Sequence, residues 1–261
     1  MNLTNLLMAF VAFFPVALAH SWVEQLMKIG SNGAFVGEPG YPRHFVGRTE
    51  PGYNDDIFVY LLPPNGRGSG ILPSDKISKY SREYRDEFPM LKAAPGDMVA
   101  LRYQENGHVS LPDTQANKPL NRGTVYVYGT ADAKDDDKLL SVFGQWTADG
   151  KGGDGRGRLL ATRNYDDGQC HQDNQGEIAL SRLAQFPKGN DPLQGEKNLW
   201  CQNDIRLPND LAEGTIYTLY WVWVWPTLTP ELRPNSKDGK FPMQGEGVSI
   251  LYNPSLESWT F

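Results

Sequence analysis

The chain has 261 residues, of which 39% are hydrophobic and 21% are charged, and its formal net charge is −6. This length suits one large domain with a full hydrophobic core. Acidic and basic residues are interspersed, which excludes the basic stripe of a nucleic-acid-binding protein, so we expect no nucleic-acid partner.

The first 19 residues predict a secretory signal peptide. An apolar stretch runs from Leu6 to Ala19 and ends in Ala-Leu-Ala, whose small residues suit signal peptidase. We therefore expect cleavage between Ala19 and His20, and a secreted, extracellular, monomeric protein with a single domain over residues 20–261. The apolar stretch is too short to span a bilayer and no longer one follows, so no membrane association is expected after processing.

His20 would then be the first residue of the mature protein. An N-terminal histidine offers its free α-amine and its imidazole, which together chelate a divalent metal ion. The α-amine has a pKa near ~8, so a metal displaces its proton at modest cost. The alternative is that His20 is incidental, because any residue can follow a signal peptide and cleavage one or two residues away would destroy the chelate.

The mature chain predicts short strands separated by turns. The candidates are rich in β-branched or aromatic residues and mostly bounded by Gly, Pro, Asn or Asp; they are Ile57–Leu62, Met98–Gln104, Thr124–Gly129, Arg158–Thr162 and Thr215–Trp225. In the last of these, both alternating faces are largely apolar, which predicts a central strand whose aromatic side chains belong to the core. The pattern favours a mostly β fold, a two-sheet β-sandwich with long loops.

Helix signals are weaker. A short helix is expected within Ser74–Phe88, and one or two turns over Ile178–Gln185. Asp135–Asp137 is interpreted as a solvated loop. The proline-containing stretch from about residue 226 to 261 is expected to be an irregular C-terminal segment.

A metal site at His20 needs further ligands, and the other histidines are His44, His108 and His171. His108 is favoured because Asn106-Gly107, directly after a strand, is a tight-turn pair that can present the next side chain at the rim of a sheet. Two imidazoles and one amine form a tetragonal nitrogen set, which is typical of Cu(II). The sequence has no Gly-x-Ser-x-Gly or His-Glu-x-x-His motif that would favour hydrolysis instead.

The chain contains two cysteines, Cys170 and Cys201. In an oxidising compartment they predict one disulfide, which would close a loop of about 30 residues and stabilise the fold by roughly 3 kcal/mol. The alternative is two unpaired thiols.

These features together resemble a known family. The signal peptide cut before histidine, a His-Ser-Trp opening at His20, a Gly-His-Val around His108 and a late Tyr-Thr-Leu-Tyr-Trp-Val-Trp strand are similar to the lytic polysaccharide monooxygenases, and more narrowly to secreted fungal proteins allied to them. The resemblance covers most of residues 20–226. It implies an immunoglobulin-like or fibronectin-III-like β-sandwich with a surface copper "histidine brace" formed by His20 and His108. It also implies oxidative cleavage of glycosidic bonds in chitin, cellulose or a related polysaccharide, with an external electron donor.

The C-terminus departs from that family, whose members place an axial Tyr or Phe near the copper on the last core strand. The best candidate here is Tyr252, and the missing spacing puts catalysis in doubt more than copper binding. Glu105 and Glu246 are candidates for an acid that would steer a bound oxygen species, with a plain surface carboxylate as the alternative for each.

Three early aromatic residues could stack on sugar rings of a polysaccharide surface: Trp22, Tyr41 and Tyr53. Buried packing is an equally good interpretation of each. Two other functions stay open. The first is a non-catalytic copper protein that uses the same brace, and the second is a metal-free carbohydrate-binding or cell-wall protein in which His20 is incidental.

Overall fold

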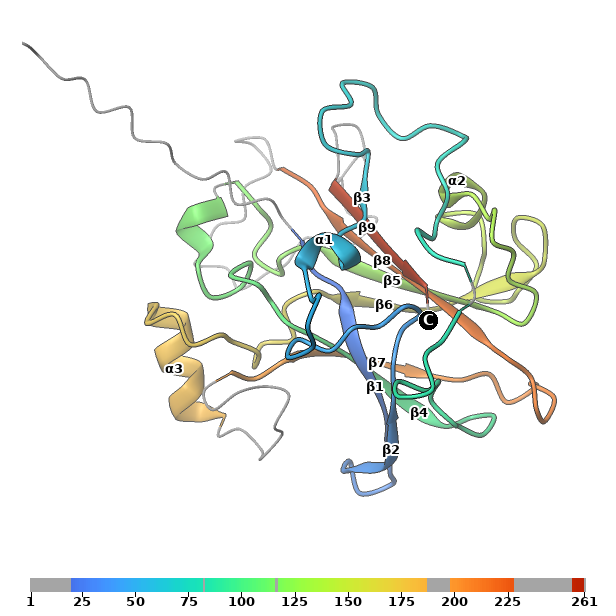
Figure 1. Cartoon of the computed structure of the whole chain (residues 1–261), viewed down its shortest axis with the longest axis horizontal. Coiled ribbons are helices and arrows are strands. Elements are labelled where there is room, and N and C mark those ends of the chain that lie inside the picture. Colours follow the sequence, from blue (N-terminus) through green and yellow to red (C-terminus); the bar gives the residue numbers. More distant parts are fainter. Residues whose placement is uncertain (1–19, 82, 116, 187–197, 228–254, 261) are drawn as a thin grey trace, which may run out of the picture.

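The structure, a computed structural model, describes residues 20–81, 83–115, 117–186, 198–227 and 255–260. Two antiparallel sheets pack face to face around a shared hydrophobic core (Figure 1). The expectation of a mostly β sandwich is confirmed. The expected signal peptide, Tyr252 and Glu246 lie outside the described residues.

The first sheet has four strands in the order β2-β1-β4-β7. Their bounds are Val23–Ile29 for β1, Phe35–Gly40 for β2, Met98–Tyr103 for β4 and Cys201–Arg206 for β7. Only β4 matches a strand expected from the sequence. The others carry polar side chains inside the strand; among these, Gln25 of β1 pairs with Arg102 of β4.

The second sheet has five strands in the order β3-β9-β8-β5-β6. Their bounds are Leu61–Leu62 for β3, Thr124–Thr130 for β5, Gly157–Asn164 for β6, Thr218–Trp225 for β8 and Ser255–Thr260 for β9. Three of these agree with expected strands to within a few residues. Strand β9 lies in the C-terminal segment that was expected to be irregular, so that expectation is wrong for its last residues.

Strand β8 is buried along its whole length, as its pattern predicts. Its Trp221, Trp223 and Trp225 face the core between the sheets. On its other face, Tyr220 belongs to a second hydrophobic cluster, which is covered by the segment around α2 (Leu139–Val142). The tryptophans of β8 are therefore core residues, because both faces of the sheet are covered.

Two local expectations are wrong. Residues 57–62 do not form one strand, because Asn54 caps a short helix α1 (Asp55–Phe58) by accepting a hydrogen bond from the Asp56 amide, and only β3 follows. No described residue of 74–88 is helical. There Ile77 is fully buried and its amide donates to the Asp137 carbonyl, so tertiary packing replaces the local helix.

The remaining helical elements are a 3₁₀ turn, η1, over Pro112–Gln115 and α3 over Glu177–Gln185, and α3 confirms the expected helix. Asp137 is not solvated as expected. It is buried, pairs with Arg156 and accepts a hydrogen bond from the Tyr220 hydroxyl at 2.8 Å. A buried carboxylate needs such partners to stay charged.

Cys170 and Cys201 form the expected disulfide, with their Cα atoms 4.6 Å apart. It ties the loop before α3 to the first residue of β7, which pairs with Tyr103 at the end of β4. Among the described residues, no helix has the length and apolar composition needed to cross a membrane.

Candidate metal centre at one end of the sandwich

His20 is positioned by the pairing of β1 with β4. Val23 at the start of β1 lies opposite Tyr103 at the end of β4. Between His20 and the strand, the Ser21 hydroxyl donates a hydrogen bond to the Gln104 carbonyl at 2.8 Å. The chain before β1 is therefore fixed beside the loop that follows β4.

His108 comes from that loop, in the turn that its sequence predicts. Asn106 and Gly107 both have positive φ, 46° and 80°, a conformation that glycine adopts without strain and asparagine tolerates. The turn closes with the His108 amide donating to the Glu105 carbonyl at 2.8 Å. The turn reverses the chain, so the side chain of His108 returns to the end of the sandwich where β1 begins.

The two histidines meet at this end. The backbone nitrogen of His20 donates to Nε2 of His108 at 3.1 Å, and the ring centroids are 6.4 Å apart and nearly perpendicular. The Asn106 side-chain amide donates to the His20 carbonyl at 2.9 Å and fixes the residue further. His44 lies beside Glu83 and Tyr80, and His171 contacts the Gln169 carbonyl, so neither is placed in this pair.

The spacing of the two nitrogens fits two ligands of one metal ion. Nitrogen ligands bonded at about 2.0 Å and at a right angle to one another lie about 2.8 Å apart. The nitrogen of His20 and Nε2 of His108 are 3.1 Å apart. The donor set is therefore suited to a metal that accepts adjacent nitrogen ligands.

Asp55 supplies a contact that the sequence did not reveal. Its Oδ2 lies 3.3 Å from Nε2 of His20, and its Oδ1 accepts a hydrogen bond from the Tyr53 hydroxyl at 2.8 Å. Metal-binding histidines commonly donate their second ring N–H to a carboxylate, which fixes the ring and its tautomer. In a neutral His20 ring with the proton on Nε2, the lone pair is on Nδ1, the nitrogen that can join the backbone nitrogen in a chelate.

A buried ion pair lies beside this contact. Glu24 is buried and pairs with Arg48, whose guanidinium also lies 5.1 Å from the Trp22 ring and 5.3 Å from the Tyr53 ring. Burial raises the pKa of Glu24, while the hydrogen bond from Arg48 opposes that rise. Burial likewise raises the pKa of Tyr53, so its hydroxyl stays a hydrogen-bond donor to Asp55.

His108 is packed against the end of β8. Its ring lies edge-on to Trp225 and Trp223, with centroid distances of 4.6 and 5.2 Å. The ammonium of Lys118 lies 4.3 Å from the centroid of Trp225 and donates to the Trp225 carbonyl. Burial lowers the pKa of Lys118 to about 8. The aromatic wall holds the imidazole of His108 in one place and leaves it little freedom to turn.

Glu105, one of the two candidate acids, bonds to the loop that carries His108. It is buried, and its carboxylate accepts hydrogen bonds from the Val109 amide at 2.7 Å, the Ser110 amide at 3.3 Å, the Ser110 hydroxyl and the Gln172 amide at 3.2 Å. With four donors, the carboxylate is used to hold the loop that carries His108. It is therefore not the surface carboxylate that was the alternative, and its role toward a bound oxygen species stays a prediction.

The three aromatic residues expected to bind sugars are placed differently from one another. Trp22 is only 1% exposed and stacks on Phe58 at 5.2 Å, so its face is not offered to a ligand. Tyr41 packs against a hydrophobic cluster with Phe45 and Phe88. Tyr53 is half-buried and reaches His20 through Asp55, whereas the Trp22 ring stacks on the His20 ring itself, with centroids 6.0 Å apart.

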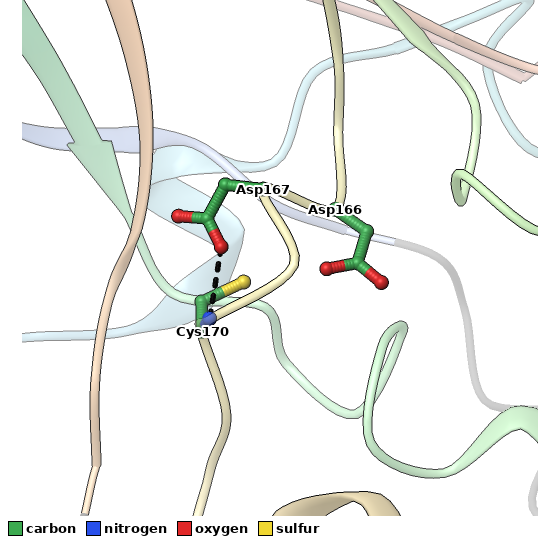
Figure 2. Close-up of side chains that lie close together, drawn as sticks. All are labelled: Asp166, Asp167 and Cys170. Carbon is green, nitrogen blue, oxygen red and sulfur yellow. Dashed lines mark hydrogen bonds between the residues drawn. The ribbon is translucent and has the colours of Figure 1, made fainter. Parts of the chain in front are cut away.

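A second group of potential ligands, Asp166, Asp167 and Cys170, lies elsewhere (Figure 2). Cys170 is in the disulfide, and Asp166 pairs with Arg182. One oxygen of Asp167 accepts the Cys170 amide, as the dashed line in Figure 2 shows, and burial raises the pKa of its carboxyl. Each group is already used by the protein, so this cluster stabilises a turn.

Comparison with known proteins gives one result. A family model described as a domain of unknown function (DUF7492) matches residues 17–243. Neither the curated proteins nor the solved structures gave a match.

Proposed function

The chain belongs to the family of domains of unknown function DUF7492, and we propose that it is a secreted copper protein that cleaves polysaccharides oxidatively. The observation that carries the proposal is the 3.1 Å distance between the His20 nitrogen and Nε2 of His108. If signal peptidase cuts before His20, that nitrogen becomes a free amine. The chain then presents two imidazoles and an amine at one place.

The donor set favours copper among the common divalent metals. Copper(II) prefers tetragonal nitrogen sets and has the highest affinity in the divalent series. A structural zinc site would need a fourth Cys or His ligand, and among the described residues neither His44 nor His171 is placed beside the pair. Bound copper would supply one-electron chemistry that activates O₂ or H₂O₂ for hydroxylation of a sugar C–H bond, with electrons from an external donor.

The residues of the chain would bind and orient that metal. His20 and His108 are the ligands, and Asp55 orients the His20 ring. Trp225 closes the site on the His108 side. The His20 side chain is 28% exposed and the Asp55 side chain 47%, so the site opens to solvent at the end of the sandwich, where an insoluble polymer such as chitin or cellulose could reach it.

A second candidate is copper binding without catalysis. It is favoured by the burial of Trp22, which removes an aromatic platform for sugars, and by the hydrogen bonds that engage the Glu105 carboxylate within its own loop. Both functions share the same two ligands and differ only in whether a polymer is oxidised.

The first experiment is a Cu(II) titration of the secreted protein, followed by electron paramagnetic resonance, after mass spectrometry has confirmed that the chain begins at His20. We expect one tight site with a tetragonal nitrogen signal. His108→Ala should abolish it, while His44→Ala, which removes an imidazole elsewhere, should leave it unchanged. The lack of a tight site in protein that begins at His20 would exclude both copper functions.

The second experiment separates the copper functions. Chitin and cellulose are incubated with the copper-loaded protein and a reductant, and soluble oxidised oligosaccharides are measured. Products that require copper, reductant and His20 support the monooxygenase, and tight copper binding without products supports the non-catalytic protein. Retention on either polymer that a chelator does not affect, in protein without a copper site, would point to the metal-free binding protein.

A further inference from the structure

A cavity of about 650 Å³ lies at the opposite end of the sandwich from His20 and His108. Its floor is formed by side chains of three strands, Leu26 of β1, Val99 of β4 and Leu219 of β8, all of which belong to the core. Because β4 and β8 end near the histidines, Val99 and Leu219 mark the other end of the same strands. In Figure 1, the connection from β7 to β8 lies at the right edge of the view, whereas β1 begins near its middle, beside α1.

Two loops form the walls. One precedes β4 (residues 84–95) and the other connects β7 to β8 (residues 207–217). The first loop is held against β2, because the Tyr41 amide donates to the Pro89 carbonyl at 2.9 Å and a Cβ on Gly40 would lie 2.2 Å from the Leu91 backbone nitrogen. The two loops are joined where the Gly96 amide donates to the Pro208 carbonyl at 3.3 Å. The walls are thus fixed by backbone contacts.

The lining is mainly aliphatic, and some of it is exposed. Met90 on one wall is 40% exposed and Ile216 on the other is 60% exposed. Side chains of this kind at the mouth of a cavity are costly to leave in water and are typical of ligand sites. The cavity volume lies within the range of about 300–1,000 Å³ that small-molecule sites occupy.

The charges at the mouth favour an anion on one wall. Lys28 and Lys92 both line the cavity, and the Lys28 ammonium is 3.9 Å from the Asp97 carboxylate, so its charge is partly balanced. Among the described residues Lys92 makes no ion pair, and it is exposed. Glu213, on the other loop, is the acidic residue of the lining. The lysine side therefore offers a partner for a carboxylate.

We propose that this cavity binds an aliphatic chain that carries a single carboxylate, with the chain inserted between the two sheets and the carboxylate near Lys92. An unbranched alkyl chain suits a space between packed sheets that is lined by Leu, Val, Ile and Met side chains. The site is independent of the metal centre and of the function proposed for it.

The test is a calorimetric titration of the metal-free, secreted protein with dodecanoate, below the concentration at which dodecanoate forms micelles. We expect binding of one molecule per chain. Affinity should rise along the series octanoate, decanoate, dodecanoate by up to about fourfold for each added methylene, as for transfer of CH₂ from water. Dodecanol should bind at least tenfold more weakly than dodecanoate.

Two variants locate the site. Ala93→Trp, on the exposed wall, should fill the mouth and abolish binding, and Lys92→Glu should weaken dodecanoate at least tenfold. The matched control Lys134→Glu reverses an exposed lysine outside the lining and should change nothing. Circular dichroism confirms that each variant is folded.

Three results would overturn the proposal. The first is that the folded chain does not bind dodecanoate one to one. This result would also be obtained if another segment of the chain or a second copy filled the cavity. The second is binding that Ala93→Trp leaves unchanged, which would place the fatty acid elsewhere. The third is equal affinity for dodecanol and dodecanoate, or no effect of Lys92→Glu, which would remove the carboxylate from the assignment.

Discussion

The two ends of strands β4 and β8 have opposite chemistry. At the end where the histidines lie, several polar contacts fix the site: Glu105 holds the loop, Asn106 holds His20 and Asp55 holds its ring. At the other end, aliphatic side chains such as Ile216 are exposed around a cavity. The same strands thus support a site of fixed geometry at one end and a site of apolar volume at the other.

The two ends should therefore respond differently to mutation. A site held by polar contacts depends on single hydrogen bonds, because a buried donor without an acceptor costs about 1–3 kcal/mol. An open apolar site depends on shape and total area, so single exposed side chains matter little for folding. The following changes test that contrast.

The largest effect is expected from Glu105→Ala. This change leaves the Val109 and Ser110 amides without their buried acceptor, so the free energy of unfolding should fall by about 3–5 kcal/mol. Chemical denaturation monitored by tryptophan fluorescence measures it. The matched change at the cavity end, Glu213→Ala, removes an exposed carboxylate and should cost under about 0.5 kcal/mol. Equal losses at the two ends would contradict the contrast.

Asp55→Asn should weaken copper binding at the proposed site by about 10–100-fold, because it weakens the carboxylate contact to the His20 ring. The affinity is measured against a competing chelator, with the electron paramagnetic resonance spectrum as a second readout. Tyr53→Phe, one contact further from the ring, should have a smaller effect in the same direction. Asp56→Asn, an exposed neighbour, is the control; a loss equal to that of Asp55→Asn would rule out a specific contact.

Lys118 gives a pH dependence at the histidine end. Burial lowers its pKa from the ordinary 10.5 to about 8, so between these pH values the unfolded chain binds the proton more strongly than the folded chain. The stability of the native protein should therefore rise with pH through this window, relative to Lys118→Met. Chemical denaturation of the two metal-free proteins at about pH 7.5 and at about pH 10 measures how the difference in their stability changes across most of this window. A stability gap that does not change with pH would contradict the burial of this ammonium.

The smallest effect is expected from Ile216→Ser at the cavity end. Because Ile216 is 60% exposed, the free energy of unfolding should change by no more than about 0.5 kcal/mol. The same substitution should weaken dodecanoate binding. A large loss of stability would mean that the cavity wall is part of the folding core.

The sequence predicted the elements whose signals are local. Strand β8 shows apolar residues on both faces, and Asn106-Gly107 is a turn that can be recognised without tertiary contacts, so both β8 and the position of His108 could be expected. Strand β1 was missed because the partner of its buried Glu24, Arg48, comes from a distant loop. The helix expected within residues 74–88 does not form, because Ile77 packs into the second hydrophobic cluster.

The candidate site shows the same division. The pair of histidines was predicted from the start of the chain and from one turn, whereas Asp55 could not be, because nothing local marks a carboxylate that will lie 3.3 Å from a side chain 35 positions earlier. Trp22 was interpreted as a possible sugar platform. Its burial depends on stacking against Phe58, a contact distant in the sequence that no local pattern predicts.

The second hydrophobic cluster, on the face of the second sheet that points away from the core between the sheets, limits how this chain can be shortened. Tyr220 and Val222 of β8 and Tyr126 of β5 lie on a face that is covered by residues such as Leu139 and Trp146, from a connection outside both sheets. Deletion of residues 133–146 would leave a broad aromatic sheet face in water. Such a face is a template for self-association, so trimming this connection should yield aggregates even though both sheets remain.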